Sequence, residues 1–410
     1  MDRTTGISVV VIAAAAVVAP LLSELLRRWR VPSVLFELLL GILVGPAVLG
    51  WVELVPFVEG LSQFGLAILF FMAGYEIDFA RLKGTPINRG LAGWGISLVL
   101  GLGLGVVLML EGFVLSSLLI GLALTTTAIG TLMPMLRDRG MLDSPFGSYI
   151  TAAGAVGEFG PIVAITILLS ADSPMQESLL LIAFALLAVG VASLATRRQP
   201  PALIEMMQRH LSTSTQLPVR IILLLVTAMV LVAAELGLDN LLGAFAAGMI
   251  TRLALSKEQS EALAPRLEAI GFGFLIPVFF IVSGVGFDLD SLLSSTTTML
   301  KVPLFLVMML VIRGLPAMFV YRGVLTTRER SALTLLQSTA LPLLVVITQI
   351  GLETHRMKAG NAAALVGAGM LSVLVFPLVG FAVLGSSSAP TADDDEPDVG
   401  ESEALGGLVD

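Results

Sequence analysis

The chain has 410 residues, of which 56% are hydrophobic and only 13% are charged, and its mean hydropathy is +0.96. Soluble domains carry about a quarter of charged residues, so this composition excludes a soluble globular protein. The absence of cysteine excludes disulfides, thiolate metal sites and cysteine nucleophiles, and the net charge of -8 comes with no basic patch that would bind nucleic acid.

Apolar runs of about twenty residues recur along the chain, which is the length needed to cross about 30 Å of hydrocarbon. The runs are continuous rather than alternating, so they predict helices and not a barrel. We therefore expect an all-α polytopic membrane protein within residues 1–384, followed by a disordered acidic tail at 385–410. The expected transmembrane helices number about thirteen, at residues 7–26, 33–50, 61–80, 90–110, 114–136, 146–170, 176–195, 219–236, 240–256, 268–287, 300–321, 330–351 and 359–384.

Lysine and arginine are distributed unevenly between the two sets of connections. Of 23 cations, eighteen lie in the connections after the odd-numbered spans and four on the opposite side, with Arg313 inside a span. Cytoplasmic connections are enriched in Lys and Arg, so the N-terminus is predicted outside and the C-terminus in the cytoplasm of a cell (inner) membrane.

Two short motifs recur seven spans apart. FFMAGYEIDF in the third span resembles FFIVSGVGFD in the tenth, with Gly74 aligned to Gly284 and Asp78 to Asp288, and TTTAIG in the fifth resembles STALP in the twelfth. An odd separation reverses the direction of a helix, so we expect inverted repeats, a feature of secondary transporters. The expected repeats are residues 7–170 and 219–384, with 176–195 as a linker helix.

Glu158 lies midway along the sixth span, between Gly157 and the Gly160–Pro161 pair. Ionisable residues at membrane depth are costly to bury and are usually functional. A single carboxylate there can bind either a proton or a cation, and competition between the two for one site is a complete mechanism for antiport. The alternative is a polar residue that faces a water-filled cavity or forms a structural pair.

Arg313 is the only cation at mid-span. A guanidinium keeps its proton, so Arg313 is expected to be paired or to neutralise helix C-termini rather than to carry protons. A structural and a functional role are equally open. Glu76, at the end of the third span, is a candidate for a cytoplasmic funnel.

Hydroxyls, glycine and proline at membrane depth predict a pair of broken helices, because they loosen a helix and free its carbonyls to bind cations. The alternative is ordinary packing of small residues between helices. The residues at the two predicted breaks are Thr125, Thr126, Thr127 and Gly130 in the fifth span, and Ser338, Thr339 and Pro342 in the twelfth.

Taken together, VPSVLFELLLGILVGPAVLG, LSQFGLAILFFMAGYEIDF, LTTTAIGTLMPMLRDRG, LLGAFAAGMI and IPVFFIVSGVGFDLD make the chain resemble the monovalent cation/proton antiporter superfamily, in its Kef-type and NapA-type branch. The resemblance covers nearly all of residues 10–384. It implies an NhaA/NapA-like fold with a core domain, a dimerisation domain that forms a homodimer, and two crossed, unwound core helices.

The resemblance also implies site residues. The ion-binding acid of the family falls on Glu158, the basic core residue on Arg313 and the unwound crossing on Thr126 and Thr127. The residue before the acid is Asp, Asn or Gln in familiar members and is Gly157 here. One carboxylate implies one-for-one, electroneutral exchange.

We therefore expect exchange of Na⁺ or K⁺ for H⁺ across the lipid bilayer by alternating access, serving ion and pH homeostasis without a cofactor. Two alternatives are a proton-coupled symporter of an organic anion on the same fold, with Arg313 as its anion site, and an ion channel. An enzyme is not expected, because no span carries a His-rich metal motif, a Ser–Lys dyad or paired catalytic Asp residues.

Overall fold

The computed structural model describes residues 2–26, 31–77, 84–137, 139–169, 174–197 and 215–385, and the regular elements within these ranges are helices. The first half contains α1 (Arg3–Leu25), α2 (Ser33–Val44), α3 (Pro56–Glu76), α5 (Thr85–Leu110), α6 (Ser117–Ala123), α7 (Ile129–Arg137), α8 (Pro145–Leu169) and α9 (Pro174–Arg197). The second half contains α11 (Leu217–Glu235), α12 (Asn240–Ala254), α13 (Lys257–Ile270), α14 (Ile276–Val285), α15 (Leu289–Leu293), α16 (Thr296–Met309), α17 (Leu315–Val320), α18 (Thr327–Leu336), α19 (Pro342–Glu353) and α20 (Ala359–Leu384). Two π-helical segments, Gly271–Leu275 and Leu310–Gly314, join α13 to α14 and α16 to α17.

The all-α membrane fold expected from the sequence is confirmed. Within the described ranges, eight helical segments are long and apolar enough to cross a bilayer, and four shorter apolar helices accompany them. The expected span at 114–136 is formed by two short helices, α6 and α7. The total of thirteen stays a prediction, and Asp78 and residues 386–410 of the expected tail lie outside the described residues.

Two predicted boundaries were wrong. The second span ends at Val44 rather than at 50, because Gly45 is extended and Pro46 follows it. The tenth begins at Lys257 rather than at 268, where Ser256 and Gln259 form a capping box. The first turns of α13 are polar, so apolar run length did not reveal them.

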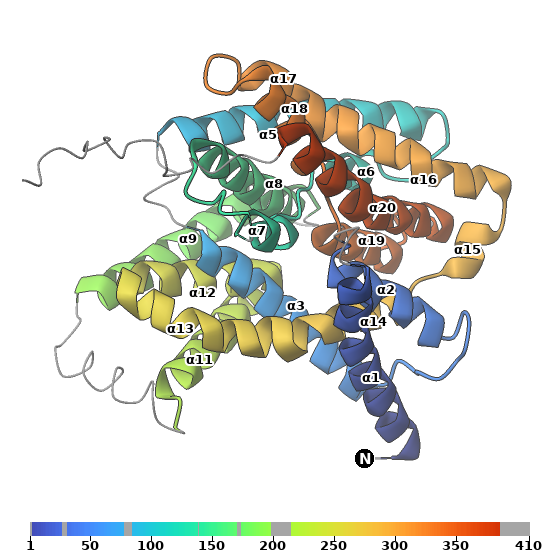
Figure 1. Ribbon diagram of the computed structural model, residues 1–410, viewed down its shortest axis with the longest axis horizontal. Coiled ribbons are helices and arrows are strands. Elements are labelled where there is room, and N and C mark those ends of the chain that lie inside the picture. The colour runs from blue at the N-terminus through green and yellow to red at the C-terminus, as the bar shows by residue number, and fades with distance from the viewer. Residues whose placement is uncertain are drawn as a thin grey trace, which may run out of the picture.

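The helices form two bundles (Figure 1). The first, which we call the scaffold bundle, contains α1, α2, α3, α9 and α11 to α14; the second, the core bundle, contains α5 to α8 and α15 to α20. Packing is extensive inside each bundle and sparser between them, where α3 meets α7, α8 meets α9 and α12, and α2 meets α20.

Close helix crossings in the scaffold bundle depend on glycine. Gly74 of α3 faces the backbone of Phe245 in α12, and Gly284 of α14 faces the backbone of Leu38 and Gly41 in α2, so close that a Cβ at either glycine would overlap backbone atoms. Small residues permit such approach between membrane helices. α3 thus crosses α12 closely, and α14 crosses α2 in the same way.

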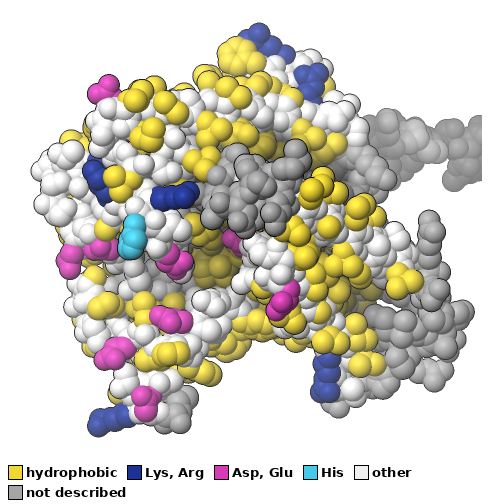
Figure 2. Space-filling view, turned by 180° about the vertical axis from the view of Figure 1, so that it is seen from behind, with side chains coloured by type: hydrophobic (Ala, Val, Ile, Leu, Met, Phe, Trp, Pro, Cys, Tyr) yellow, Lys and Arg dark blue, Asp and Glu magenta, His cyan; other side chains and the backbone are white. Residues whose placement is uncertain are grey.

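Apolar side chains cover much of the surface of the molecule, and charged side chains are scattered across the face shown in Figure 2. Large apolar residues are exposed along several helices, including Val10, Val99, Leu110, Leu224 and Leu300. Such a surface suits contact with lipid rather than with water.

Candidate functional site

The first broken helix lies between α6 and α7. Helical structure stops at Ala123 and resumes at Ile129. The hydroxyls of Thr125 and Thr126 donate to the carbonyls of Leu122 and Ala123, at 2.8 Å each, and so satisfy the end of α6. Of the residues predicted at this break, Gly130 alone lies inside a helix, in the first turn of α7.

The second broken helix lies between α18 and α19. Helical structure stops at Leu336, passes through non-helical Ser338 and Thr339, and resumes at Pro342, the first residue of α19. Proline is favoured at that position because the first N–H groups of a helix have no partner within it. The crossed, unwound helices expected from the sequence are therefore present.

The two breaks bond to each other. The N–H of Ala128 donates to the carbonyl of Thr339 at 2.7 Å, and the hydroxyl of Thr127 donates to the carbonyl of Gln337 at 2.5 Å. Each break is also tied to the long helix that follows it. The N–H of Thr127 donates to Gly157 of α8 at 3.0 Å, and the hydroxyl of Ser372 in α20 bonds both the N–H and the carbonyl of Ala340.

Glu158 points into this crossing from α8. The residue is 2% exposed, and its carboxyl lies near the N–H groups of Ile129 and Gly130, at the start of α7. The positive end of a helix dipole and unpaired N–H groups attract an anion at such a position. One oxygen, Oε2, has no hydrogen-bond partner. The carboxyl is therefore buried beside the start of α7 and keeps one oxygen for a ligand.

Arg313 contacts α8 from the π-helical segment between α16 and α17. It is 1% exposed; its Nε donates to Thr127 Oγ1 at 2.8 Å and its Nη2 to the carbonyl of Ala153 at 2.6 Å. Among the described residues it forms no ion pair, with Glu158 or with any other acid. The guanidinium thus ties the first break to α8 and places a fixed positive charge at the crossing.

Gly157 leaves the room that Arg313 occupies. A Cβ at residue 157 would lie 2.5 Å from Arg313 Nη2 and 2.6 Å from Thr127 Oγ1. The glycine that departs from the pattern of familiar antiporters is therefore explained by packing.

The structure adds a site residue that sequence reasoning missed. Gln337, 1% exposed, donates from Nε2 to the carbonyl of Arg313 at 2.6 Å. In the sequence, the signal for this residue was an amide side chain inside an apolar span, next to the Ser338–Thr339 break. Glu37 of α2 was also missed; it is 4% exposed, and one of its oxygens has no partner.

Glu76 lies at the end of α3, close enough to Glu158 for the charges of the two carboxyls to interact. Its Oε1 is 3.9 Å from Arg137 Nη2. No group of three or more His, Cys, Asp or Glu side chains that could hold a metal ion gathers within the described ranges.

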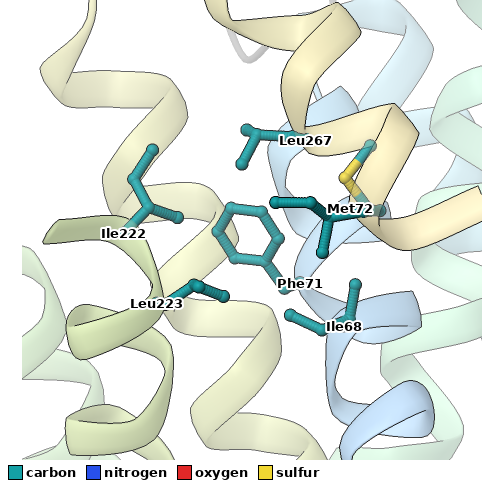
Figure 3. A pocket seen from close by; sticks show the side chains of 7 residues that line it. Ile68, Phe71, Met72, Ile222, Leu223 and Leu267 are labelled. Atoms are coloured by element: carbon teal, nitrogen blue, oxygen red, sulfur yellow. The ribbon is translucent and has the colours of Figure 1, made fainter. Parts of the chain in front are cut away.

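A small pocket lies between α3, α11 and α13 and is separate from this crossing (Figure 3). Its lining is apolar throughout, so it offers no ligand for a cation. Phe71 lies in its middle, and the other lining residues are Ile68, Met72, Ile222, Leu223, Leu267 and Ile270.

Comparisons with known proteins agree with this geometry. The chain is 26% identical over 397 residues to the putative Na⁺/H⁺ antiporter YjbQ of Bacillus subtilis, covering 92% of this chain and 63% of that protein. It is 25% identical over 374 residues to a Na⁺/H⁺ antiporter of Enterococcus hirae, covering 87% and 93%. It is 25% identical over 284 residues to the Na⁺/H⁺-K⁺ antiporter GerN of Bacillus cereus, covering 66% and 70%. The chain thus spans less than two thirds of the first of these relatives and most of the second.

The fold has a counterpart among solved structures. The sodium proton antiporter MjNhaP1 from Methanocaldococcus jannaschii superposes with a TM-score of 0.64 at 14% identity, over 94% of this chain and 99% of that one. The profile of the family described as sodium/hydrogen exchanger, transmembrane, matches residues 13–385. The chain belongs to the transmembrane sodium/hydrogen exchanger family.

Proposed function

We propose that the chain exchanges a monovalent cation, Na⁺ or K⁺, for H⁺ across a cell membrane by alternating access, with Glu158 as the shared site. The observation that carries this proposal is the environment of the Glu158 carboxyl. It is buried at the crossing, lies beside the start of α7, and has one oxygen without a partner. Either a proton or a cation can satisfy that oxygen, and binding of one excludes the other.

The unwound backbone supplies further oxygen ligands. Among the described residues, the carbonyls of Thr126 and Thr127 accept no hydrogen bond. The hydroxyl of Thr127 already donates to Gln337 and accepts from Arg313, so it anchors the crossing and contributes through its carbonyl. Monovalent cations bind well to such freed carbonyls at broken helices.

The charges at the crossing support one-for-one exchange. Arg313 is a fixed +1 and Glu158 is the one acid, because residue 157 is glycine. The site then carries the same net charge whether Glu158 holds a proton or a monovalent cation. A cycle that swaps one for the other moves no net charge, so exchange is electroneutral.

The arrangement disfavours the other two functions. Arg313, the anion site that a symporter would need, already uses Nε and Nη2 to hold Thr127 and Ala153. A channel would need a continuous pore, whereas Glu158, Thr126 and Thr127 are each 2% exposed or less.

The two bundles suit alternating access. The core bundle carries Glu158 and the scaffold bundle faces it through a sparser contact. We propose that the halves 7–170 and 219–384 are inverted repeats, that the scaffold bundle forms the homodimer contact, and that the N-terminus is outside with the C-terminal tail in the cytoplasm. The distribution of Lys and Arg supports this orientation.

The direct test is dissipation of a pH gradient in proteoliposomes, with Na⁺, K⁺ and Li⁺ added in turn. We expect cation-dependent proton flux in the wild type that is independent of a clamped membrane potential and abolished in Glu158→Gln. Glu353→Gln is the matched control, because Glu353 is an exposed acid at the end of α19 that accepts a hydrogen bond from Gln349. Exchange at the wild-type rate in Glu158→Gln would refute the shared-site mechanism.

A further inference from the structure

The contact between the two bundles has two layers beside Glu158. Phe159 follows Glu158 on α8, and its ring stacks on that of Phe245 of α12, with centroids 4.5 Å apart and planes at 21°. Ala152 and Ala155 of α8, Ala73 of α3 and Ile77, which follows α3, complete an apolar cluster around the two rings. This cluster, which we call the apolar layer, extends from Glu158 toward the end of the molecule where α8 begins and α3 ends.

A polar layer lies at the same end of the molecule, where α3 and α7 end. Arg137, the last residue of α7 in the core bundle, is bonded through Nη1 to Glu268 of α13 in the scaffold bundle, at 2.9 Å. Its Nη2 is 3.9 Å from Glu76 of α3, also in the scaffold bundle. One guanidinium therefore spans the junction and meets two acids on the opposite bundle.

The two layers differ in exposure in the way expected of an outer and an inner barrier. The side chain of Arg137 is 48% exposed and that of Glu268 33%, whereas that of Glu76 is 9% exposed and the residue Phe245 is 2% exposed. Exposed ion pairs contribute little to stability, so water can replace this one at small cost. A stack of rings excludes water and hydrated ions as long as it is closed.

We propose that these layers form a gate between Glu158 and the end of the molecule at which α3 and α7 end, with Arg137 and Phe245 as its positioning residues. The gate rests on the proposed exchange function and adds residues that do not touch the ion. In each cycle the Arg137–Glu268 pair separates, Phe245 leaves Phe159, and Glu76 loses the nearby guanidinium of Arg137. The freed carboxylate of Glu76 then faces the open route and attracts the next cation toward Glu158.

The absence of cysteine makes a direct test possible in the full-length chain. In Arg137→Cys/Glu268→Cys the two new thiols are the only ones, and a short bifunctional methanethiosulfonate can join them. We expect joining to lower cation-dependent proton flux at least tenfold, and a reductant that cleaves the link to restore it. Gln349→Cys/Glu353→Cys, joined within the single helix α19, is the matched control and should keep its rate.

The outcomes separate the gate from the function beneath it. If the wild-type protein shows no cation-dependent proton flux with any of the cations, the exchange function itself is refuted. Full flux in protein whose cross-link is verified by mass would overturn the gate and leave the exchange function standing.

A second measurement applies if the double-cysteine variant does not fold. A single thiol placed by Ala155→Cys, in the apolar layer, should react slowly with a membrane-impermeant maleimide, and at least tenfold faster when Phe245→Ala is added. Phe274→Ala, at a residue that is 53% exposed, is the control and should leave the labelling rate unchanged. Equal labelling with and without Phe245→Ala would overturn the role of the ring stack.

Discussion

The guanidinium of Arg313 lies in the space that a side chain at residue 157 would fill, although the two residues are 156 positions apart in the sequence. The carbonyl of Gly157 also accepts a hydrogen bond from the N–H of Thr127. The missing side chain therefore leaves room for Arg313, and the backbone of the same residue bonds the first break. The single-acid site and its fixed positive charge are thus two results of one packing arrangement.

Gly157→Ala tests this arrangement. The new methyl group overlaps Arg313 Nη2 and Thr127 Oγ1, and overpacking of a tight site costs about 1–3 kcal/mol. We expect a lower melting temperature in detergent and strongly reduced exchange. Gly103→Ala in α5 is the control, because a Cβ there meets nothing within 4 Å. A variant at residue 157 as stable and active as the control would contradict the arrangement.

Glu158→Asp should keep exchange but weaken cation binding. The shorter side chain draws the carboxylate away from the N–H groups of Ile129 and Gly130. The attraction of a helix N-terminus for an anion is worth about 0.3–1 kcal/mol, and up to about 2 kcal/mol when partly buried, so the half-saturating cation concentration should rise severalfold. The measurement is the cation dependence of proton flux, with Glu353→Asp as control. An unchanged half-saturating concentration would show that the reach of the carboxyl is unimportant.

Arg313→Lys should fail although it preserves the charge. The ammonium of lysine places its N–H donors at one atom, whereas the guanidinium of Arg313 reaches Thr127 and Ala153 at once through two nitrogens. Loss of one buried hydrogen bond lowers stability by about 1–3 kcal/mol, and the first break loses its tie to α8. Thermal unfolding and flux are compared with Arg322→Lys, at a residue whose guanidinium lies over the ring of Phe319. Wild-type behaviour of Arg313→Lys would mean that charge alone is required.

Gln337→Leu should separate stability from ion recognition. It removes the bond from Nε2 to the carbonyl of Arg313 and keeps the backbone carbonyl that accepts from Thr127. We expect destabilisation of about 1–2 kcal/mol with the order of preference among Na⁺, K⁺ and Li⁺ unchanged. Gln349→Leu, at an exposed position, is the control. A changed order of preference would place Gln337 among the ion ligands.

Several features of the fold and the site followed from local sequence alone. Long apolar runs permit only helices in a bilayer, because every backbone group must find its partner there. Thr125 to Thr127 and Ser338 to Pro342 mark the breaks, because their chemistry loosens a helix wherever it is placed. Glu158 stands out because an acid at membrane depth is costly and rare.

Other features were decided by tertiary structure. The position of Arg313 beside Gly157, the bond from Gln337 to Arg313 and the pairing of Arg137 with Glu268 each join segments far apart in sequence. Composition and periodicity report only on neighbours within a few turns. Which side chain fills the space beside a given glycine depends on how the helices pack, and this packing left Glu158 one unpartnered oxygen at the crossing.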